Sequence, residues 1–248
     1  MNRHERRAAK SKSRTTGHRI VAIHEAGHAC GRVLAAPAFE LSPADMIDSI
    51  KIGSGQVIGR SHMSRSTLLI SQAVTYGPLL SAAMRTAVDE RNVPGSTLTY
   101  QHIARLLTIA RGEGLNVDEW LRGQLLQIAM GSAAEAKYTG ASVETVWDSY
   151  ASEGDRKDAI RACELCAGLA PAEAQSLIGQ ALKRAEMLVE KVGVYRAILL
   201  LADKLPIAGR MSGRQAARII MGALGGTTVG CEETGLLPMR SALPGAAE

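Results

Sequence analysis

Residues 21–29 of the chain read VAIHEAGHA and contain the pattern H-E-x-x-H within a segment of helical composition. Successive residues of an α-helix advance about 100° around its axis, so His24 and His28 share one face, a turn apart. Two imidazoles in this arrangement can bind one metal ion, and catalytic zinc keeps a further position open for water. Glu25 follows the first histidine, where its carboxylate can act as a general base on that water. The motif therefore predicts a hydrolytic Zn2+ site with His24 and His28 as ligands and Glu25 as the catalytic residue.

The helix that carries the motif is predicted to cover about residues 17–36, because Pro37 ends the helical pattern. Within it, Ala26, Gly27 and Ala29 are small. Small side chains on a helix allow a neighbouring segment to approach closely, so we expect another element to pack against this turn.

Most of the remaining chain has apolar residues at helical spacing. Helices are predicted over about residues 67–91, 98–112, 118–137, 154–168, 171–192, 194–204 and 213–224. Residues 47–58 instead predict two short strands joined by a glycine turn beside the first helix. The stretch 140–154 is predicted to be a loop. The expected fold is therefore mostly α, with a small β-hairpin near the metal helix.

Composition indicates one globular domain with extensions at both ends. The chain has 248 residues, of which 46% are hydrophobic and 21% charged. Residues 1–14 hold six Lys and Arg against one acid, whereas the remainder is formally neutral. We therefore expect a disordered basic arm over 1–14, a domain over 15–224 and a flexible tail over 225–248. Nucleic acid is expected to bind only weakly, through the basic arm.

The expected location is the cytoplasm. No apolar stretch reaches the roughly 18 to 20 residues that a membrane-spanning helix needs, and the N-terminus lacks the apolar segment of a signal peptide. Four cysteines are too few for a disulfide scaffold in a chain of this length. We therefore expect no membrane association.

Two histidines need a third protein ligand to form a catalytic zinc site. Each of the other four histidines stands alone in the sequence: His4, His18, His62 and His102. The acidic residues of the later segments are better candidates: Glu135, Glu144, Asp148, Glu153, Asp155 and Asp158. Spacing alone leaves the choice among these acids open.

The motif segment resembles the metal helix of the peptidase domain of the FtsH-type AAA proteases. Residues 128–135, IAMGSAAE, resemble that family's small-residue helix ending in Ala-Ala-Glu. Residues 152–155, SEGD, followed four positions later by Ala159, resemble the start of the family's helix that bears the third zinc ligand. The resemblance implies that Asp155 completes the metal site. Glu144 is the alternative, because the TGAS stretch just before it is also similar to the segment that precedes the family's aspartate.

The resemblance implies a zinc-dependent endopeptidase that hydrolyses peptide bonds of flexible or unfolded proteins. It covers about four fifths of the chain, with residues 64–117 as an insertion. The family's membrane segments are absent from the sequence, and so is the phosphate loop G-x-x-x-x-G-K-[ST] of an ATPase module. Folded substrates would therefore need a separate unfoldase, and the oligomeric state stays open.

Two alternatives to an active peptidase follow from the same residues. The first is a catalytically silent peptidase-like domain that binds proteins, although such a role would not require Glu25. The second is a nucleic-acid-associated protein that acts through the basic arm.

Overall fold

The computed structural model describes residues 3–37, 42–47, 49–52, 59–62, 117–167, 171–208, 210–225 and 234–236. The elements follow one another as α1 (Arg3–Ala35), η1 (Pro43–Asp45), β1 (Ser49–Ile52), β2 (Gly59–His62), α5 (Val117–Thr139), α6 (Val143–Trp147), η3 (Tyr150–Ser152), α7 (Glu153–Ala167), α8 (Pro171–Glu190), α9 (Val192–Ala208), β3 (Arg210–Ser212) and α10 (Gly213–Ala223). The prediction of a mostly α fold with a small β-hairpin is confirmed.

The predicted helices that lie in the described residues occur as α1, α5 and α7 to α10, and all of these except α1 lie close to their expected limits. The helices predicted over 67–91 and 98–112, and nearly all of the insertion predicted over 64–117, lie outside the described residues. Among the described helices, none is both long enough and apolar enough to cross a membrane.

The first helix begins at Arg3, well before the start predicted near Gly17. Basic composition predicts disorder over residues 1–14, and residues 3–14 belong to α1. The physical reason is local: residues 3–16 contain no glycine or proline, and eight of the 14 are Arg, Lys or Ala, which have high helix propensity.

The stretch 140–154, predicted to be a loop, contains the short helices α6 and η3. Gly140 has φ of 75° and follows the end of α5, a position that favours glycine because the left-handed region strains other residues. Ser142 then caps α6, its Oγ accepting a hydrogen bond of 3.1 Å from the Thr145 N–H. Val143 and Trp147 of α6 are buried, so packing as well as capping stabilises this short helix.

The three strands form an antiparallel sheet in the order β2-β1-β3. The predicted hairpin is therefore present, with its second strand at Gly59–His62, slightly later than expected, and residues 53–58 outside the described part. β3 comes from the far end of the chain, where no strand was predicted. Ile50 of β1 pairs with Met211 of β3, and both side chains are buried against the helices.

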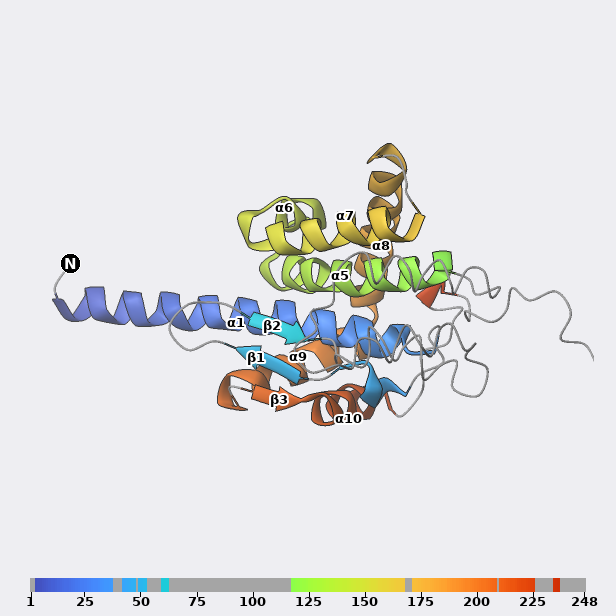
Figure 1. Cartoon of the computed structure of the whole chain (residues 1–248). Helices are drawn as coiled ribbons and strands as arrows, with labels where there is room; N and C mark the ends of the chain where they lie inside the picture. The colour runs from blue at the N-terminus through green and yellow to red at the C-terminus, as the bar shows by residue number, and fades with distance from the viewer. Residues whose placement is uncertain are drawn as a thin grey trace, which may run out of the picture.

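The second half of α1, which carries the H-E-x-x-H motif, occupies the middle of the molecule, and the first half extends away from the other elements (Figure 1). As Figure 1 shows, α5 lies along one side of α1, while the sheet and α10 lie on the other, and α9 also packs against α1. Helices α6, α7 and α8 cover the far side of α5. The core consists mainly of Ala, Leu, Ile, Val and Met side chains. This enclosure places the H-E-x-x-H turn of α1 in the interior.

Part of the predicted flexible tail packs onto the body. Thr234 and Leu236 are buried, and Arg184 of α8 donates a hydrogen bond of 2.9 Å from its Nε to the Thr234 carbonyl oxygen. Gly235 has φ of 66°, in the left-handed region that favours glycine. The burial of Leu236 explains why these residues dock on α8; most other residues of the tail lie outside the described part.

Candidate metal centre

The metal motif lies where α1 and α5 approach each other closely. A Cβ added at Gly27 would be 2.4 Å from the carbonyl oxygen of Met130, and one added at Gly31 would be 2.8 Å from the Met130 Cγ. Both distances are shorter than any normal contact of a Cβ, so only glycine permits this approach of the two helices. The expectation that small residues admit a neighbouring element is confirmed, and that element is α5.

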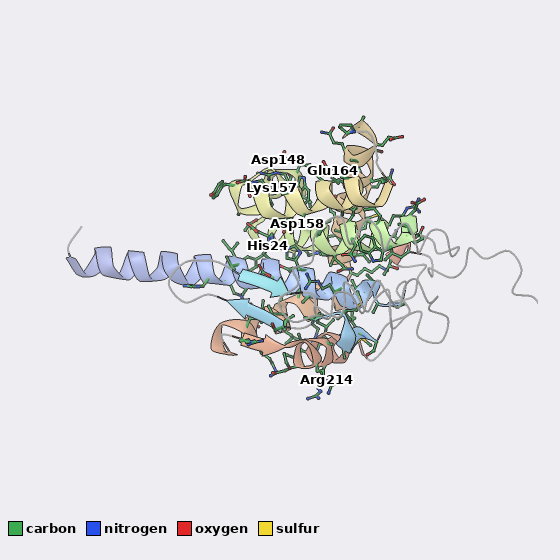
Figure 2. The ribbon with its side chains drawn as sticks, viewed as in Figure 1. His24, Asp148, Lys157, Asp158, Glu164 and Arg214 are labelled. Carbon is green, nitrogen blue, oxygen red and sulfur yellow. The ribbon has the colours of Figure 1, made fainter. Side chains whose placement is uncertain are left out.

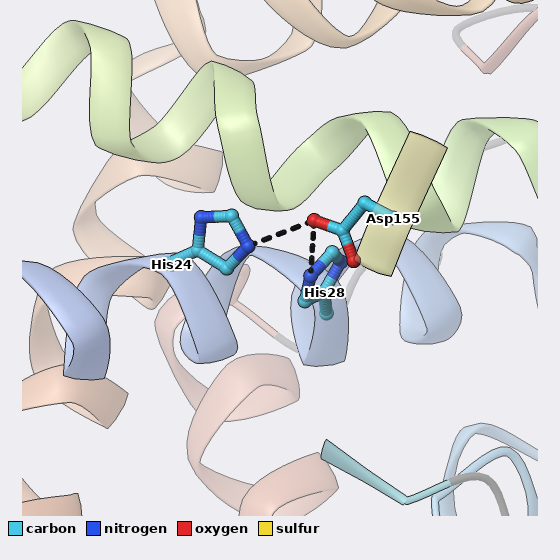
Figure 3. A group of neighbouring side chains, drawn as sticks. All are labelled: His24, His28 and Asp155. Atoms are coloured by element: carbon cyan, nitrogen blue, oxygen red, sulfur yellow. Dashed lines mark hydrogen bonds and ion pairs between the residues drawn. The ribbon is translucent and has the colours of Figure 1, made fainter. Parts of the chain in front are cut away.

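Three side chains converge beside this crossing, as shown in Figure 3. The Nε2 of His24 lies 3.0 Å from the Oδ2 of Asp155, and the Nε2 of His28 lies 3.4 Å from the same oxygen. One ligand atom from each residue lies within 4.8 Å of the others. Their side chains are only 10% to 21% exposed. His24, His28 and Asp155 therefore form a group that could hold a metal ion.

The other ring nitrogen of each histidine has its own partner on α5. The Nδ1 of His24 lies 2.9 Å from the Oε2 of Glu135, and the Nδ1 of His28 donates to the carbonyl oxygen of Gln127 at 3.0 Å. A partner at Nδ1 fixes the orientation of an imidazole and leaves Nε2 for a metal. Glu135, one of the acids considered for the third ligand, is thus placed to orient His24 instead.

Asp155 reaches the site from the first turn of α7, and nearby side chains hold that turn in place. Ser152 is fully buried, and its Oγ donates to the Val146 carbonyl oxygen at 2.9 Å. Arg156 donates to the carbonyl oxygens of Trp147 and Ser149, the latter at 2.7 Å. These bonds tie the start of α7 to the segment before it. A carboxylate in the first turn also interacts favourably with the helix dipole.

The histidines and Asp155 shift each other's pKa values. Burial acts to lower the pKa of His24, but its hydrogen bonds with Asp155 and Glu135 outweigh burial and raise that pKa to about 10. Burial acts to raise the pKa of Asp155, but the positive charges and hydrogen bonds of His28 and His24 hold it well below its usual range. At neutral pH His24 therefore carries a proton when no metal is bound. A metal ion that binds there must displace this proton.

Two further charged side chains of α1 lie in this region. Glu25 is only 6% exposed, and within the described residues its Oε2 has no hydrogen-bond partner. Burial lowers the pKa of Arg32 to about 10, while the negative charges of Glu25 and Asp155 act in the opposite direction. Arg32 therefore remains a cation at neutral pH. Arg32 was not among the predicted site residues, although its position four residues after His28 places both on one helix face.

The remaining candidates for a third ligand do not join the group within the described residues. Glu144 and Asp148 are exposed at α6, and Asp158 is exposed on α7. Glu153 pairs with Lys157 at the surface. His18 is outside the group, while the side chains of the other three histidines considered, His4, His62 and His102, are not among those described.

Gly131 of α5 makes room for the two imidazoles, and its replacement should disturb them. A Cβ at this position would lie 2.4 Å from the Cε1 of His28 and 2.9 Å from the Nε2 of His24. Because His28 is also held by a main-chain carbonyl, it cannot move away without losing that bond. We expect Gly131→Ala to weaken metal affinity by about 10- to 100-fold, as does the loss of a group that orients a ligand. Competition with a chromogenic chelator measures this affinity.

Gly179 provides the matched control, because it is also a helical glycine, but a Cβ there meets nothing within 4 Å. Gly179→Ala should leave metal affinity unchanged and raise the free energy of unfolding by about 0.5 to 1 kcal/mol. Equal metal affinity of the Gly131→Ala variant and the native protein would contradict the geometry described for the site.

Among the described residues, His24, His28 and Asp155 form a group able to hold a metal ion, and Glu25, next to His24 in the sequence, has a buried carboxylate. Comparison with protein-family models finds none that matches the chain. A search of curated proteins finds no significant match. The chemistry of the site itself is therefore the basis for assigning a function.

Proposed function

We propose that this chain is a zinc-dependent endopeptidase that hydrolyses peptide bonds of flexible or unfolded proteins. The observation that carries the proposal is the placement of Glu25: its carboxylate is buried and has an oxygen without a hydrogen-bond partner among the described residues, next in sequence to His24. Leaving such an oxygen unpaired costs about 1 to 3 kcal/mol or more. A catalytic base needs an oxygen that is available to accept a proton, and this role would explain why the Glu25 oxygen is left unpaired.

The donor atoms favour zinc over the other common divalent ions. Two imidazole nitrogens and one carboxylate oxygen are typical of catalytic zinc, whereas Mg2+ and Ca2+ are bound almost entirely by oxygen. Three protein ligands from His24, His28 and Asp155 leave a fourth position for water or substrate. When bound, a zinc ion there would supply Lewis acidity toward water and a peptide carbonyl group.

The protein side chains perform the proton transfers and keep the site oriented. Glu25 takes the proton from the attacking water and passes it to the departing amine nitrogen. Glu135 holds the Nδ1 of His24 and so keeps Nε2 directed at Asp155. Arg32 places a positive charge near two carboxylates, which balances part of their charge.

Strand β2 is suited to hold the substrate. It packs against α1 and pairs with β1 along one edge, while no other described strand pairs with its second edge. Peptides in extended conformation bind such edges through main-chain hydrogen bonds, which require no particular sequence. Because a folded protein rarely exposes an extended segment, this mode of binding favours flexible or unfolded substrates.

The resemblance to the FtsH-type peptidase domain supports the same proposal. The residues that carry it include the motif helix around His24 and the segment that ends in Asp155, and these two segments meet at one site. On this reading the fold is a helical metallopeptidase-like domain. A separate unfoldase would supply the work of opening stable substrates.

Denatured substrates should be cleaved much faster than the same proteins in their folded form. A peptidase reaches only backbone that is already open, and a stable domain opens against much of its free energy of unfolding. The assay compares a stable folded domain with a destabilised, unfolded variant of identical cleavage sites. Gel densitometry over time gives both rates for the zinc-loaded protein.

Addition of ATP and Mg2+ is the control in this assay, and it should change neither rate because the sequence has no phosphate loop. Equal cleavage of folded and unfolded substrates would contradict the proposed substrate class. No cleavage of either substrate by protein with one zinc per chain would favour a silent, peptide-binding domain.

A further inference from the structure

Arg32 lies on the same face of α1 as two residues of the proposed active site. Each residue of an α-helix advances about 100° around the axis, so Arg32 lies about 20° from Glu25 and about 40° from His28 around α1. Helical side chains also lean toward the N-terminus of their helix, which directs the guanidinium group of Arg32 back along α1 toward these two residues. The metal helix therefore carries a cation on the side of the proposed base.

The charges of the site agree with this placement. Burial has the largest influence on the pKa of His24 and on that of Arg32, and it acts to lower both. The negative charges of Glu25 and Asp155 act in the opposite direction on both groups. Arg32 and His24 thus lie within electrostatic range of the same two carboxylates, one from α1 and one from α7. Arg32 therefore belongs to the same group of charges as the metal centre.

The guanidinium group of Arg32 is largely withdrawn from water. Its side chain is only partly exposed, and its Nε and Nη1 atoms are buried. The pKa of Arg32 still lies at about 10, so the group is charged at neutral pH. A charge in a site that excludes water acts more strongly on its neighbours than a charge at the surface. Burial of a cation is costly, and a role in the reaction would explain its presence there.

Other cations of α1, α5 and α7 contact groups outside the metal centre. Their partners are as follows: Arg19 with Asp203, Arg122 with Glu119, Lys137 with Glu190, Lys157 with Glu153, and Arg156 with the carbonyl oxygens of Trp147 and Ser149. In Figure 2, Lys157 lies on α7 at the outer side of the molecule, whereas His24 lies inside it, between α1 and α5. Among the described cations, Arg32 is therefore the best placed to supply positive charge beside Glu25.

Peptide hydrolysis moves negative charge within such a site. The oxygen of the attacking water bonds to the carbonyl carbon, the π electron pair of the C=O bond moves to its oxygen, and a water proton passes to Glu25. Glu25 is then neutral, and the substrate oxygen is the oxyanion of a tetrahedral intermediate. When the C–N bond breaks, the electron pair restores the C=O bond and the proton passes from Glu25 to the nitrogen, which gives a carboxylic acid and an amine.

We propose that the guanidinium group of Arg32 stabilises this oxyanion through its charge and its hydrogen bonds, which makes Arg32 a catalytic residue. The inference rests on the proposed peptidase activity and adds a residue to it. Before the reaction, the charge of Glu25 balances the cation. Once Glu25 has taken the proton, the oxyanion is the negative charge that needs stabilisation. An interaction that is stronger in the transition state than in the bound substrate raises kcat.

The test measures how tightly the zinc-loaded, full-length protein binds a phosphinic peptide, whose tetrahedral anionic phosphorus group replaces the scissile peptide bond. By isothermal titration calorimetry, Arg32→Gln should bind this peptide at least about tenfold more weakly than the native protein. Its kcat should fall about 10²- to 10³-fold, the usual loss for one oxyanion donor, while KM changes little. Arg32→Lys, which keeps the charge, should recover part of both losses. Zinc content at the native level shows that each site is intact.

The same change in a Glu25→Gln background separates contact with the oxyanion from an effect on the base. Glu25→Gln/Arg32→Gln should bind the phosphinic peptide about tenfold more weakly than Glu25→Gln, because the contact does not require the carboxylate. Equal affinities of these two variants would overturn the proposal, since Arg32 would then act only through Glu25. If Arg32→Gln loses zinc or fails to fold, Arg32→Met, which keeps an apolar stem, takes its place with the same expected result.

Arg19→Gln is the matched control, because it removes another arginine of α1 that pairs with Asp203. It should leave phosphinic peptide affinity and kcat at native values. If the native protein cleaved peptides and bound the phosphinic peptide, and Arg32→Gln matched it in both, the role of Arg32 alone would be wrong. If native protein with one zinc per chain did neither, the proposed function itself would fail, and this inference with it.

Discussion

Glu25→Gln should retain bound zinc and the native fold but lose about 10²- to 10⁴-fold in kcat, the usual contribution of a positioned general base. Glutamine has nearly the same shape as glutamate but cannot take a proton from water. His24, His28 and Asp155 keep their positions, so metal content should remain near one zinc per chain. Peptide cleavage under substrate saturation and metal analysis of the same sample give both quantities.

The control for Glu25→Gln changes another buried glutamate, Glu119, which lies on α5. Glu119 is 2% exposed and forms an ion pair with Arg122. Glu119 precedes Gly131, which contacts the two histidines, by twelve residues, or about 18 Å along the helix. Glu119→Gln removes a buried charge far from the metal centre and should leave kcat unchanged, whatever it does to stability. If Glu25→Gln cleaved peptides at the native rate, Glu25 would not be the base.

His28→Ala should abolish stable metal binding, with a loss in zinc affinity of at least about a hundredfold. The side chain supplies one of three ligands, and the two that remain do not close the site. Even removal of a group that only orients a ligand costs about 10- to 100-fold, so loss of the ligand itself should exceed that range. Asp155→Asn should weaken zinc binding in the same direction, because the neutral amide is a poorer ligand than the carboxylate.

Glu144→Gln is the matched control for the third ligand. Glu144 was the alternative to Asp155 on sequence grounds, and it lies exposed on α6. The change should leave zinc affinity and cleavage at native levels. If Asp155→Asn retained zinc and Glu144→Gln lost it, Glu144 would be the third ligand, and the geometry described for the site would be contradicted. Circular dichroism of each variant separates loss of metal from loss of fold.

Local patterns in the sequence predicted much of this protein. Helical spacing identified α5 and the helices α7 to α10, because amphipathic periodicity depends only on neighbouring residues. The basic start of α1 was not predicted to be helical, because its charge is typical of disorder, although its residues have high helix propensity. The short helix α6 was missed because its stability depends on buried Trp147 as well as on the cap at Ser142.

The placement of His24 and His28 on one face of a helix was determined by the sequence alone, because four residues make about one helical turn. The third member of the metal group could not be chosen in this way. Asp155 lies 131 residues after His24. Sequence spacing did not distinguish it from the five other acids; the packing of α5 against α1 and of α7 against α5 did. The resemblance to a known family pointed to Asp155, but only packing brings it to the histidines.

The strand pairing was also decided by the tertiary structure. No strand was predicted near residue 210, yet β3 pairs with β1, a strand about 160 positions earlier in the chain. Pairing register between distant strands depends on which faces they bury together, here Ile50 with Met211, and no local pattern encodes it.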